Sequence, residues 1–423
     1  MKFEAIAPAA SPVDPGWSWR TLQAAPHRLA FFLAMLVLAG SGLWWATVQA
    51  DRVFGLGLSY ELSPSVVHSA LMTFGFFPLF FAGFLFTAGP KWLGVAGPTA
   101  RQVRTPLVLM ALGWLAWPVA AHANEWAAAA SLCVALAGLV GIALRFWRLV
   151  RASTAGDRVH AACVAVALTV GCGALAGVIG GVVADSPAVA RGFVHSALWG
   201  FIVAVYVTVA HRMIPFFTSS ALPMIEAWRP FWVLRVLLAV AAFEAAAVWV
   251  DFATQAAAWH GVRGALEITA GGIIVWLAFA WGLVQSLKVR LVAMLHIGFT
   301  WLGIGLALSG TSHLVEALTT AEWLPLAGLH AVTMGCLGSL MVAMVTRVSC
   351  GHGGRPLVAD NFVWTLFWLL QGAVLLRITA AAPLDVAMQF TLAAAIAWAV
   401  VLTAWAVRYG AWYGRARPDG RPG

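Results

Sequence analysis

The side chains best suited to chemistry in this 423-residue sequence are its 11 histidines, because only 10% of the residues are charged. Six of them form three pairs with regular spacing. These pairs are His27 with His68, His160 with His195, and His296 with His330, separated by 41, 35 and 34 residues. The tetrapeptide His-Ser-Ala-Leu begins at the second member of the first two pairs, and the third pair carries a looser match. The regularity suggests a repeated unit built around these histidines.

Neutral imidazole is the commonest side-chain ligand of iron, copper and zinc. If His68, His195 and His330 lie at similar depth around a common centre, they form a candidate metal or haem site. The sequence contains no Cys-x-x-Cys-His motif, so any haem would be of b type, held by axial ligands and packing. The alternative is that each imidazole only hydrogen-bonds a neighbouring helix.

The other histidines fall near the ends of apolar segments. His313 is a further candidate ligand on the same side as the three above. We expect His122 and His260 to be solvated in outer loops, and we place His211 and His352 on the cytoplasmic side.

Few acids interrupt the apolar segments, and Glu244 and Glu267 are the clearest. An ionisable group inside a membrane is costly, so each is a candidate proton carrier or polar contact between helices. The five cysteines have no zinc or redox spacing, and we interpret them as buried inert thiols.

The elements that must position these residues are membrane-spanning helices. Hydrophobic residues make up 62% of the chain, and a bilayer core needs roughly 20 apolar residues per helix. Because backbone polar groups in lipid must be satisfied internally, the apolar segments are expected to be helical. Twelve spans are predicted, at 27–48, 64–88, 104–121, 125–148, 159–183, 188–211, 231–251, 262–287, 291–311, 324–346, 361–380 and 386–408. The chain is therefore predicted to be an all-α polytopic membrane protein, with a cytoplasmic tail at 1–26, a transmembrane domain at 27–411 and a second cytoplasmic tail at 412–423.

Loop charges predict the orientation. Of the 25 Lys and Arg residues, 21 fall on the side that holds both termini, and the positive-inside rule places that side in the cytoplasm. The net charge of +9 thus describes topology, and it gives no reason to expect a nucleic-acid partner. The predicted location is the bacterial inner membrane, with the lipid bilayer as partner.

The histidine pairs recur every four spans. The first members stand near the cytoplasmic starts of spans 1, 5 and 9, and the second members stand just inside the outer starts of spans 2, 6 and 10. We therefore predict three pseudo-repeated four-helix units.

Five ordered segments resemble signatures of the NnrS family. They are 75–92, 211–218, 295–301, 329–335 and 347–357. The residues that match family motifs are His211, Arg212, Pro215, His296, Arg347, Gly351, His352 and Arg355. The resemblance implies a bacterial inner-membrane protein with about twelve helices, containing haem and copper. It also implies an association with denitrification and with the response to nitric oxide and nitrosative stress. In span 2 the family often has His-x-His-Glu, whereas this chain has only His68, followed by Ser69.

A more distant likeness is to the twelve-helix subunit of haem–copper oxidases, whose histidine ligands lie near the outer ends of helices 2, 6, 7 and 10. The histidine pair of helix 7 is absent here. The two resemblances lead us to expect a haem b between His68 and His330, with His195 and His313 near a copper ion.

Three functions remain open from the sequence. The first is a haem- and copper-binding protein that binds nitric oxide or acts on it or on nitrosylated metal centres. The second is a carrier for a metal, haem or small anion, with the histidines lining its path. The third is a scaffold or sensor, for which the chain offers little soluble surface.

Overall fold

The computed structural model describes residues 16–419, and within them twelve helices are long and apolar enough to cross a bilayer. The all-α prediction of twelve spans is confirmed, and the chain is a multi-pass membrane protein. Numbered in order, spans 2, 6 and 10 are each built of three consecutive elements. The elements are α1 (Trp19–Leu22), α2 (Pro26–Phe54), α3 (Pro64–Ala70), η1 (Leu71–Gly75), α4 (Phe77–Leu93), α5 (Ala100–Ala123), α6 (Glu125–Ala152), α7 (Val159–Val183), α8 (Pro187–Ala197), η2 (Leu198–Val203), α9 (Ala204–Ala221), α10 (Phe231–Ala253), α11 (Ala257–Ala280), α12 (Leu283–Ser286), α13 (Arg290–Thr319), α14 (Ala327–His330), η3 (Ala331–Gly338), α15 (Ser339–His352), α16 (Asn361–Thr379) and α17 (Ala387–Tyr413).

Some helix ends differ from the predicted spans. Span 6 was expected to end at 211, but its helix continues to Ala221, because backbone hydrogen bonding does not stop where apolar composition does. Span 8 was expected to reach 287, but α11 ends at Ala280. Gly282 follows with a φ of +99°, a left-handed conformation that turns the chain out of the helix.

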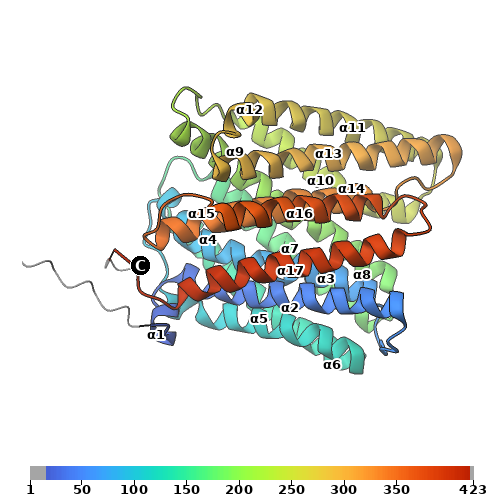
Figure 1. Cartoon of the computed structure of the whole chain (residues 1–423), viewed down its shortest axis with the longest axis horizontal. Coiled ribbons are helices and arrows are strands. Elements are labelled where there is room, and N and C mark those ends of the chain that lie inside the picture. Colours follow the sequence, from blue (N-terminus) through green and yellow to red (C-terminus); the bar gives the residue numbers. More distant parts are fainter. Residues whose placement is uncertain (1–15, 420–423) are drawn as a thin grey trace, which may run out of the picture.

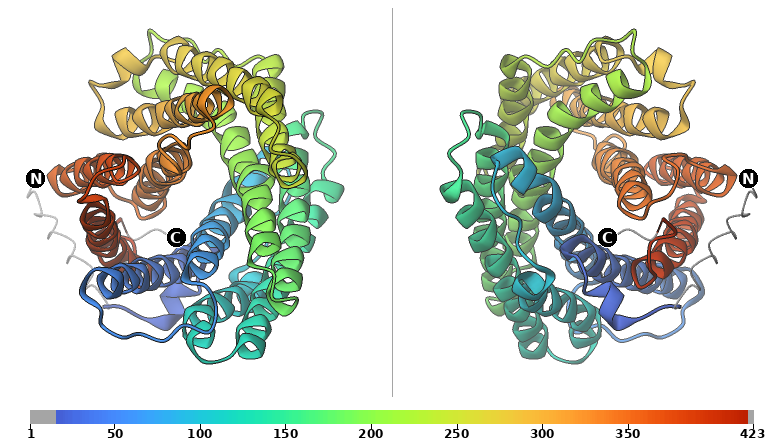
Figure 2. Two further views of the ribbon diagram at one scale, coloured as in Figure 1. Left: turned by 90° about the vertical axis from the view of Figure 1, so that its right-hand side faces the viewer. Right: turned by 90° about the vertical axis from the view of Figure 1, so that its left-hand side faces the viewer.

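The spans are arranged in a ring that encloses a smaller inner group (Figures 1 and 2). The chain runs around the bundle in sequence order, and the last helix, α17, packs against the first long helix, α2. Spans 2 and 10 are the most buried, with 83% and 72% of their central residues inside, followed by spans 6 and 9 at 67% each. The spans that carry the second histidine of each pair are therefore inner helices.

Each of spans 2, 6 and 10 contains a wide π-helical turn shortly after its histidine. These turns are η1, η2 and η3, which begin within three residues of His68, His195 and His330. Such turns are rare and concentrate at functional sites. One of them connects two inner spans, because the Tyr206 hydroxyl of α9 donates to the Leu337 carbonyl in η3, at 3.1 Å. Three similar interruptions in register are what three repeated units would give.

Glycines allow spans 8 and 9, formed by α11 and α13, to approach closely. A Cβ on Gly271 of α11 would lie 2.6 Å from the Gly303 carbonyl of α13, and one on Gly264 would lie 2.6 Å from that of Gly310. Small residues at such positions let two backbones pack together in lipid, where no hydrophobic effect drives helix association.

Both described ends of the chain lie at the same end of the bundle (Figure 1). The predicted N-terminal tail includes residues 1–15, which lie outside the described residues. Its described part contains the short helix α1, preceded by a hydrogen bond from the Ser18 N–H to the Gly414 carbonyl, at 2.8 Å. This contact joins the start of the described chain to the end of its last span.

Candidate functional site

The structure brings the three predicted ligands to one end of the inner helices. His68, His195 and His330 occupy the N-terminal parts of spans 2, 6 and 10, and all three are half-buried. His330 interacts electrostatically with His68 and with His195. Helices α3 and α8, which carry His68 and His195, are in contact. The three imidazoles therefore lie in the same region of the bundle, although they are 127 and 135 residues apart in the sequence.

His68 is held by an aromatic side chain from span 1. Its imidazole is stacked on the Trp45 indole, with ring centroids 3.7 Å apart and planes inclined by 19°. Its Nδ1 is buried without a hydrogen-bond partner. A buried polar nitrogen without a partner is costly, so this imidazole has an unused bonding capacity that a cofactor or solvent would satisfy.

His330 is oriented by its own backbone. Its Nδ1 lies 2.9 Å from the Leu326 carbonyl, which can only accept, so Nδ1 carries the proton and Nε2 keeps its lone pair. Metal-binding histidines have this arrangement, with one N–H donated to a carbonyl and the other nitrogen free. Arg377 of α16 interacts electrostatically with both His330 and His68, so a cation lies beside this pair.

His195 is the least constrained of the three. Among the described residues, no hydrogen-bond partner reaches its imidazole, whereas Arg191, Arg263 and Asp251 interact with it electrostatically. The copper prediction paired it with His313, but the structure places His313 against Glu267, with Nδ1 2.6 Å from a carboxylate oxygen. Within residues 16–419, no three His, Cys, Asp or Glu side chains are grouped closely enough to hold a metal ion.

Glu244 and Glu267 both accept hydrogen bonds from the buried guanidinium of Arg263. These residues belong to a group that we call the outer ionic cluster: Arg263, Glu244, Asp251, Glu267, His313, His260 and Glu316. Arg263 donates to Glu244 at 2.9 Å and to Glu267 at 3.0 Å, and it also donates to Asp251. Only 8% of Arg263 and 1% of each glutamate are exposed. One Arg faces three carboxylates here, so these four groups carry an excess of negative charge when all are ionised.

Two expectations about outer histidines are corrected. His260 is buried instead of solvated, and its Nδ1 lies 3.2 Å from a Glu316 carboxylate oxygen. His122 uses both ring nitrogens, since Nδ1 lies 2.6 Å from the Ser59 carbonyl and Nε2 accepts from the Trp44 indole at 3.0 Å. Both were misjudged because the hydropathy of a segment does not show which polar groups from other segments lie beside its side chains.

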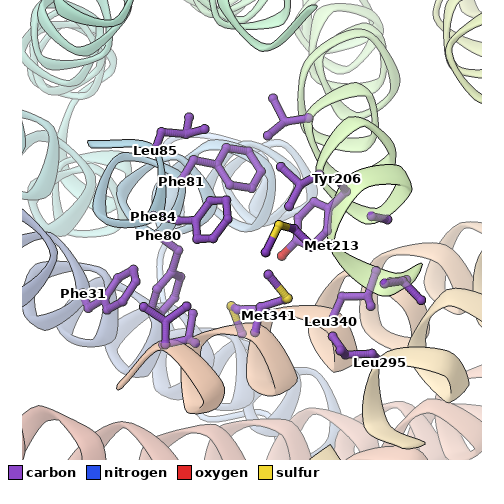
Figure 3. A pocket seen from close by; sticks show the side chains of 17 residues that line it. Phe31, Phe80, Phe81, Phe84, Leu85, Tyr206, Met213, Leu295, Leu340 and Met341 are labelled. Atoms are coloured by element: carbon purple, nitrogen blue, oxygen red, sulfur yellow. The ribbon is translucent and has the colours of Figure 1, made fainter. Parts of the chain in front are cut away.

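The inner spans line an apolar cavity of about 60 Å³ further along their length (Figure 3). Its lining is almost wholly Phe, Val, Leu and Met side chains from α4, α9 and α15, with Phe31 of α2 and Leu295 of α13. Figure 3 shows Met213 and Met341 facing one another across it, with Tyr206 at its edge. Such a lining favours a small uncharged ligand.

At the end of the bundle opposite the three candidate ligands, the family-motif histidines form hydrogen bonds that join helices. His160 Nε2 lies 3.0 Å from His211 Nδ1, and His211 Nε2 donates to the Pro230 carbonyl at 3.1 Å. His296 Nε2 lies 2.8 Å from the Thr218 hydroxyl. His211 and His296 have no measurable exposure. With their Nε2 protons engaged in this way, these side chains serve to join helices.

The remaining motif residues lie toward the C-terminal ends of spans 6 and 10. The Arg347 guanidinium is 4.0 Å from the centre of the Phe217 ring, and that of Arg212 is 5.0 Å from the Trp92 ring. Pro215 lies inside α9. His352 and Arg355, which flank Gly353 and Gly354 beyond Gly351, line a separate basic pocket described below.

The sequence did not lead us to expect Arg263 or Arg377 near the candidate site. A signal for Arg263 existed, because Glu267 follows it by four residues and such pairs meet on one helix face. Nothing in the sequence places Arg377 beside His330, which is 47 positions away on another span.

The family described as NnrS protein matches residues 21–417, a range that includes all twelve spans and every candidate residue above. A comparison with curated proteins found no match.

Proposed function

The chain belongs to the NnrS family, which supports a general role in the nitric-oxide response, and we propose that it fulfils this role as a haem- and copper-binding protein. The observation that supports the proposal is that His68, His195 and His330 lie toward the same end of the inner spans, with His330 interacting electrostatically with the other two.

The residues present fit a b-type haem held by two imidazoles. His330 keeps Nε2 free because its Nδ1 proton is donated to Leu326, and His68 has a buried nitrogen without a partner. A haem bound here would supply an iron centre that, when reduced, binds nitric oxide. Trp45 holds the plane of the His68 ring, and Arg377 supplies a positive charge suited to a carboxylate-bearing group.

His195 is the proposed copper ligand, because it is the third imidazole of the group and has no other partner. His313 stays a prediction for this role. Its Nδ1 donates to Glu267, which leaves Nε2 available. Through Arg263, which interacts with His195, the outer ionic cluster also offers carboxylates and imidazoles that can hold or release a proton near the site.

Access for nitric oxide follows from its chemistry. It is small and uncharged and enters lipid readily, and the apolar cavity between the inner spans offers it a water-poor space (Figure 3). Phe and Met side chains there provide no hydrogen bonds that would retain polar solutes.

We place the protein in the inner membrane with both termini in the cytoplasm. The excess of Lys and Arg on the side that carries the two ends supports this orientation. A reporter domain that is active only in the cytoplasm should be active when it is fused after Gly423. An inactive fusion would indicate the opposite orientation.

The function is tested by the absorption spectrum and metal content of detergent-purified protein. We expect a Soret band and copper in the wild type, loss of the Soret band in His68→Ala and His330→Ala, and loss of copper in His195→Ala. His122→Ala is the matched control, because His122 lies at the same end with both nitrogens already bonded. Unchanged spectra and copper content in the three site variants would refute the site, and a wild type without haem or copper would refute the proposal.

A further inference from the structure

A second, small pocket lies at the opposite end of the bundle, where both described chain ends meet. It is formed by the start of α2, the end of α15 and the residues that follow α17. Because three spans begin or end around it, the pocket lies at the depth where a membrane has its polar headgroups. The residues that give it its character are His27, Arg28, His352, Arg355, Arg415 and Arg417.

Arg28 is the most buried of these cations, with 4% of its surface exposed. Its Nη1 donates to the Tyr413 carbonyl at 2.9 Å and to the Arg415 carbonyl at 2.8 Å, which fixes the guanidinium in place. Among the described residues, its buried Nε has no hydrogen-bond partner. A guanidinium held in this way is suited to an oxyanion, which accepts charge-assisted hydrogen bonds from such a group.

The surroundings favour negative charge in the same place. The rings of His27 and His352 are 4.6 Å apart, so two further imidazoles face the pocket together. Arg28, Arg417 and Lys91 all interact electrostatically with His352. The first turn of α2 adds the positive end of a helix without a side-chain cap.

The described lining residues include no carboxylate. Asp419 lies close by, pairs with Arg417 and accepts from its Nε at 2.8 Å. Among the described residues, the guanidinium groups of the pocket therefore outnumber the carboxylates beside it.

We propose that this pocket binds a phosphate group. Its buried and oriented guanidinium and its excess positive charge match a tetrahedral oxyanion. Its depth allows two sources, the headgroup of an anionic phospholipid or a phosphate from solution. The site is separate from the three outer histidines, so it does not depend on the proposed haem.

The full-length protein in detergent tests the proposal. One arm titrates inorganic phosphate by calorimetry, and the other counts bound phosphatidylglycerol by native mass spectrometry, with phosphatidylcholine for comparison. Arg28→Gln removes the buried guanidinium, and loss of a charge-assisted bidentate contact should weaken binding about tenfold or more. Arg148→Gln is the matched control, because Arg148 is an exposed cation near the same end of the bundle that is not part of the pocket.

Binding of either phosphate source that is weakened in Arg28→Gln and retained in Arg148→Gln supports the site. Binding of phosphatidylglycerol without inorganic phosphate identifies a lipid site, and binding of both identifies a site open to solution. Because Arg28 also joins two chain ends, His352→Gln and Arg355→Gln provide the same test if Arg28→Gln does not fold. Absence of binding in the wild type, or equal weakening in Arg148→Gln, overturns the proposal. The Soret band of the Arg28, His352 and Arg355 variants should be unchanged. The phosphate proposal can therefore fail or succeed independently of the haem proposal.

Discussion

The Trp45 indole and the His68 imidazole lie nearly parallel, with their ring centres 3.7 Å apart. Trp45 belongs to span 1 and His68 to span 2, so the stack fixes the rotation of the imidazole from a neighbouring helix. A ligand whose ring is already oriented loses little entropy when it binds a metal. The stack should therefore raise the affinity of His68 for a cofactor.

Trp45→Leu should therefore weaken haem retention about tenfold, which is within the range for loss of a supporting contact around a metal ligand. Haem loss to an excess of an apo-globin acceptor measures the effect. Trp44→Leu is the control, because Trp44 is adjacent but bonds His122 instead. Equal haem loss in the two variants would show that the stack has no such role.

Arg377→Gln should lower the reduction potential of a haem held by His68 and His330. Reduction removes one positive charge from the iron centre, so a nearby cation favours the reduced form, and removal of that cation favours the oxidised form. The expected decrease is on the order of tens of millivolts. A spectroelectrochemical titration measures it, with Arg377→Lys retaining the potential and Arg148→Gln as a distant control. A potential that rises or stays constant in Arg377→Gln would contradict the placement of this charge.

Arg263→Met should destabilise the protein strongly, because it leaves Glu244 and Glu267 buried and unpaired. Breaking a buried ion pair typically costs about 3–5 kcal/mol. The melting temperature in detergent should fall, and it should recover when Glu244→Gln and Glu267→Gln are added. If Arg263→Met is as stable as the wild type, the cluster does not hold spans 7 and 8 together.

Gly271→Val should lower the melting temperature, because its side chain would meet the Gly303 carbonyl and Ala307 of α13. Overpacking of this kind costs about 1–3 kcal/mol. Gly272→Val is the control on the same helix, since a Cβ at Gly272 has no neighbour within 4 Å. Equal melting temperatures for the two variants would mean that α11 and α13 are not in close backbone contact.

Asp360 predicts an acid-dependent stability. Burial would raise the pKa of this carboxyl, but hydrogen bonds from Arg408 and from the Val363 N–H outweigh it and lower the pKa below 3.8. A carboxyl with a lowered folded-state pKa stabilises the fold at neutral pH and loses this effect as the pH falls through that pKa. The melting temperature of the wild type should therefore drop more between pH 7 and pH 3 than that of Asp360→Asn.

Asparagine also caps helices well, so Asp360→Asn should keep the cap of α16 and lose only the ion pair. Asp360→Ala should lose both and be the less stable of the two at pH 7. An identical pH response in wild type and Asp360→Asn would remove the assigned role of this carboxylate.

The sequence by itself determined the helical class, the number of spans and the recurrence of histidines every four spans. Lipid offers backbone groups no hydrogen bonds, so a long apolar segment in a bilayer must form a helix. Such segments can be recognised from amino-acid composition alone. The series His68, His195 and His330 was visible for the same local reason, since each lies a few residues inside the start of its span.

Only the tertiary structure decided which polar groups meet. His27 and His352 face each other across 325 positions of sequence. Arg263 binds two acids of α10, Glu244 and Asp251, besides Glu267 on its own helix. The His313 imidazole turned toward Glu267 instead of His195. Hydropathy measures how much a segment avoids water, whereas these pairings depend on the rotation of each helix about its axis. That rotation is set by close packing against other spans, including the wide turns η1, η2 and η3, which no local sequence signal announced.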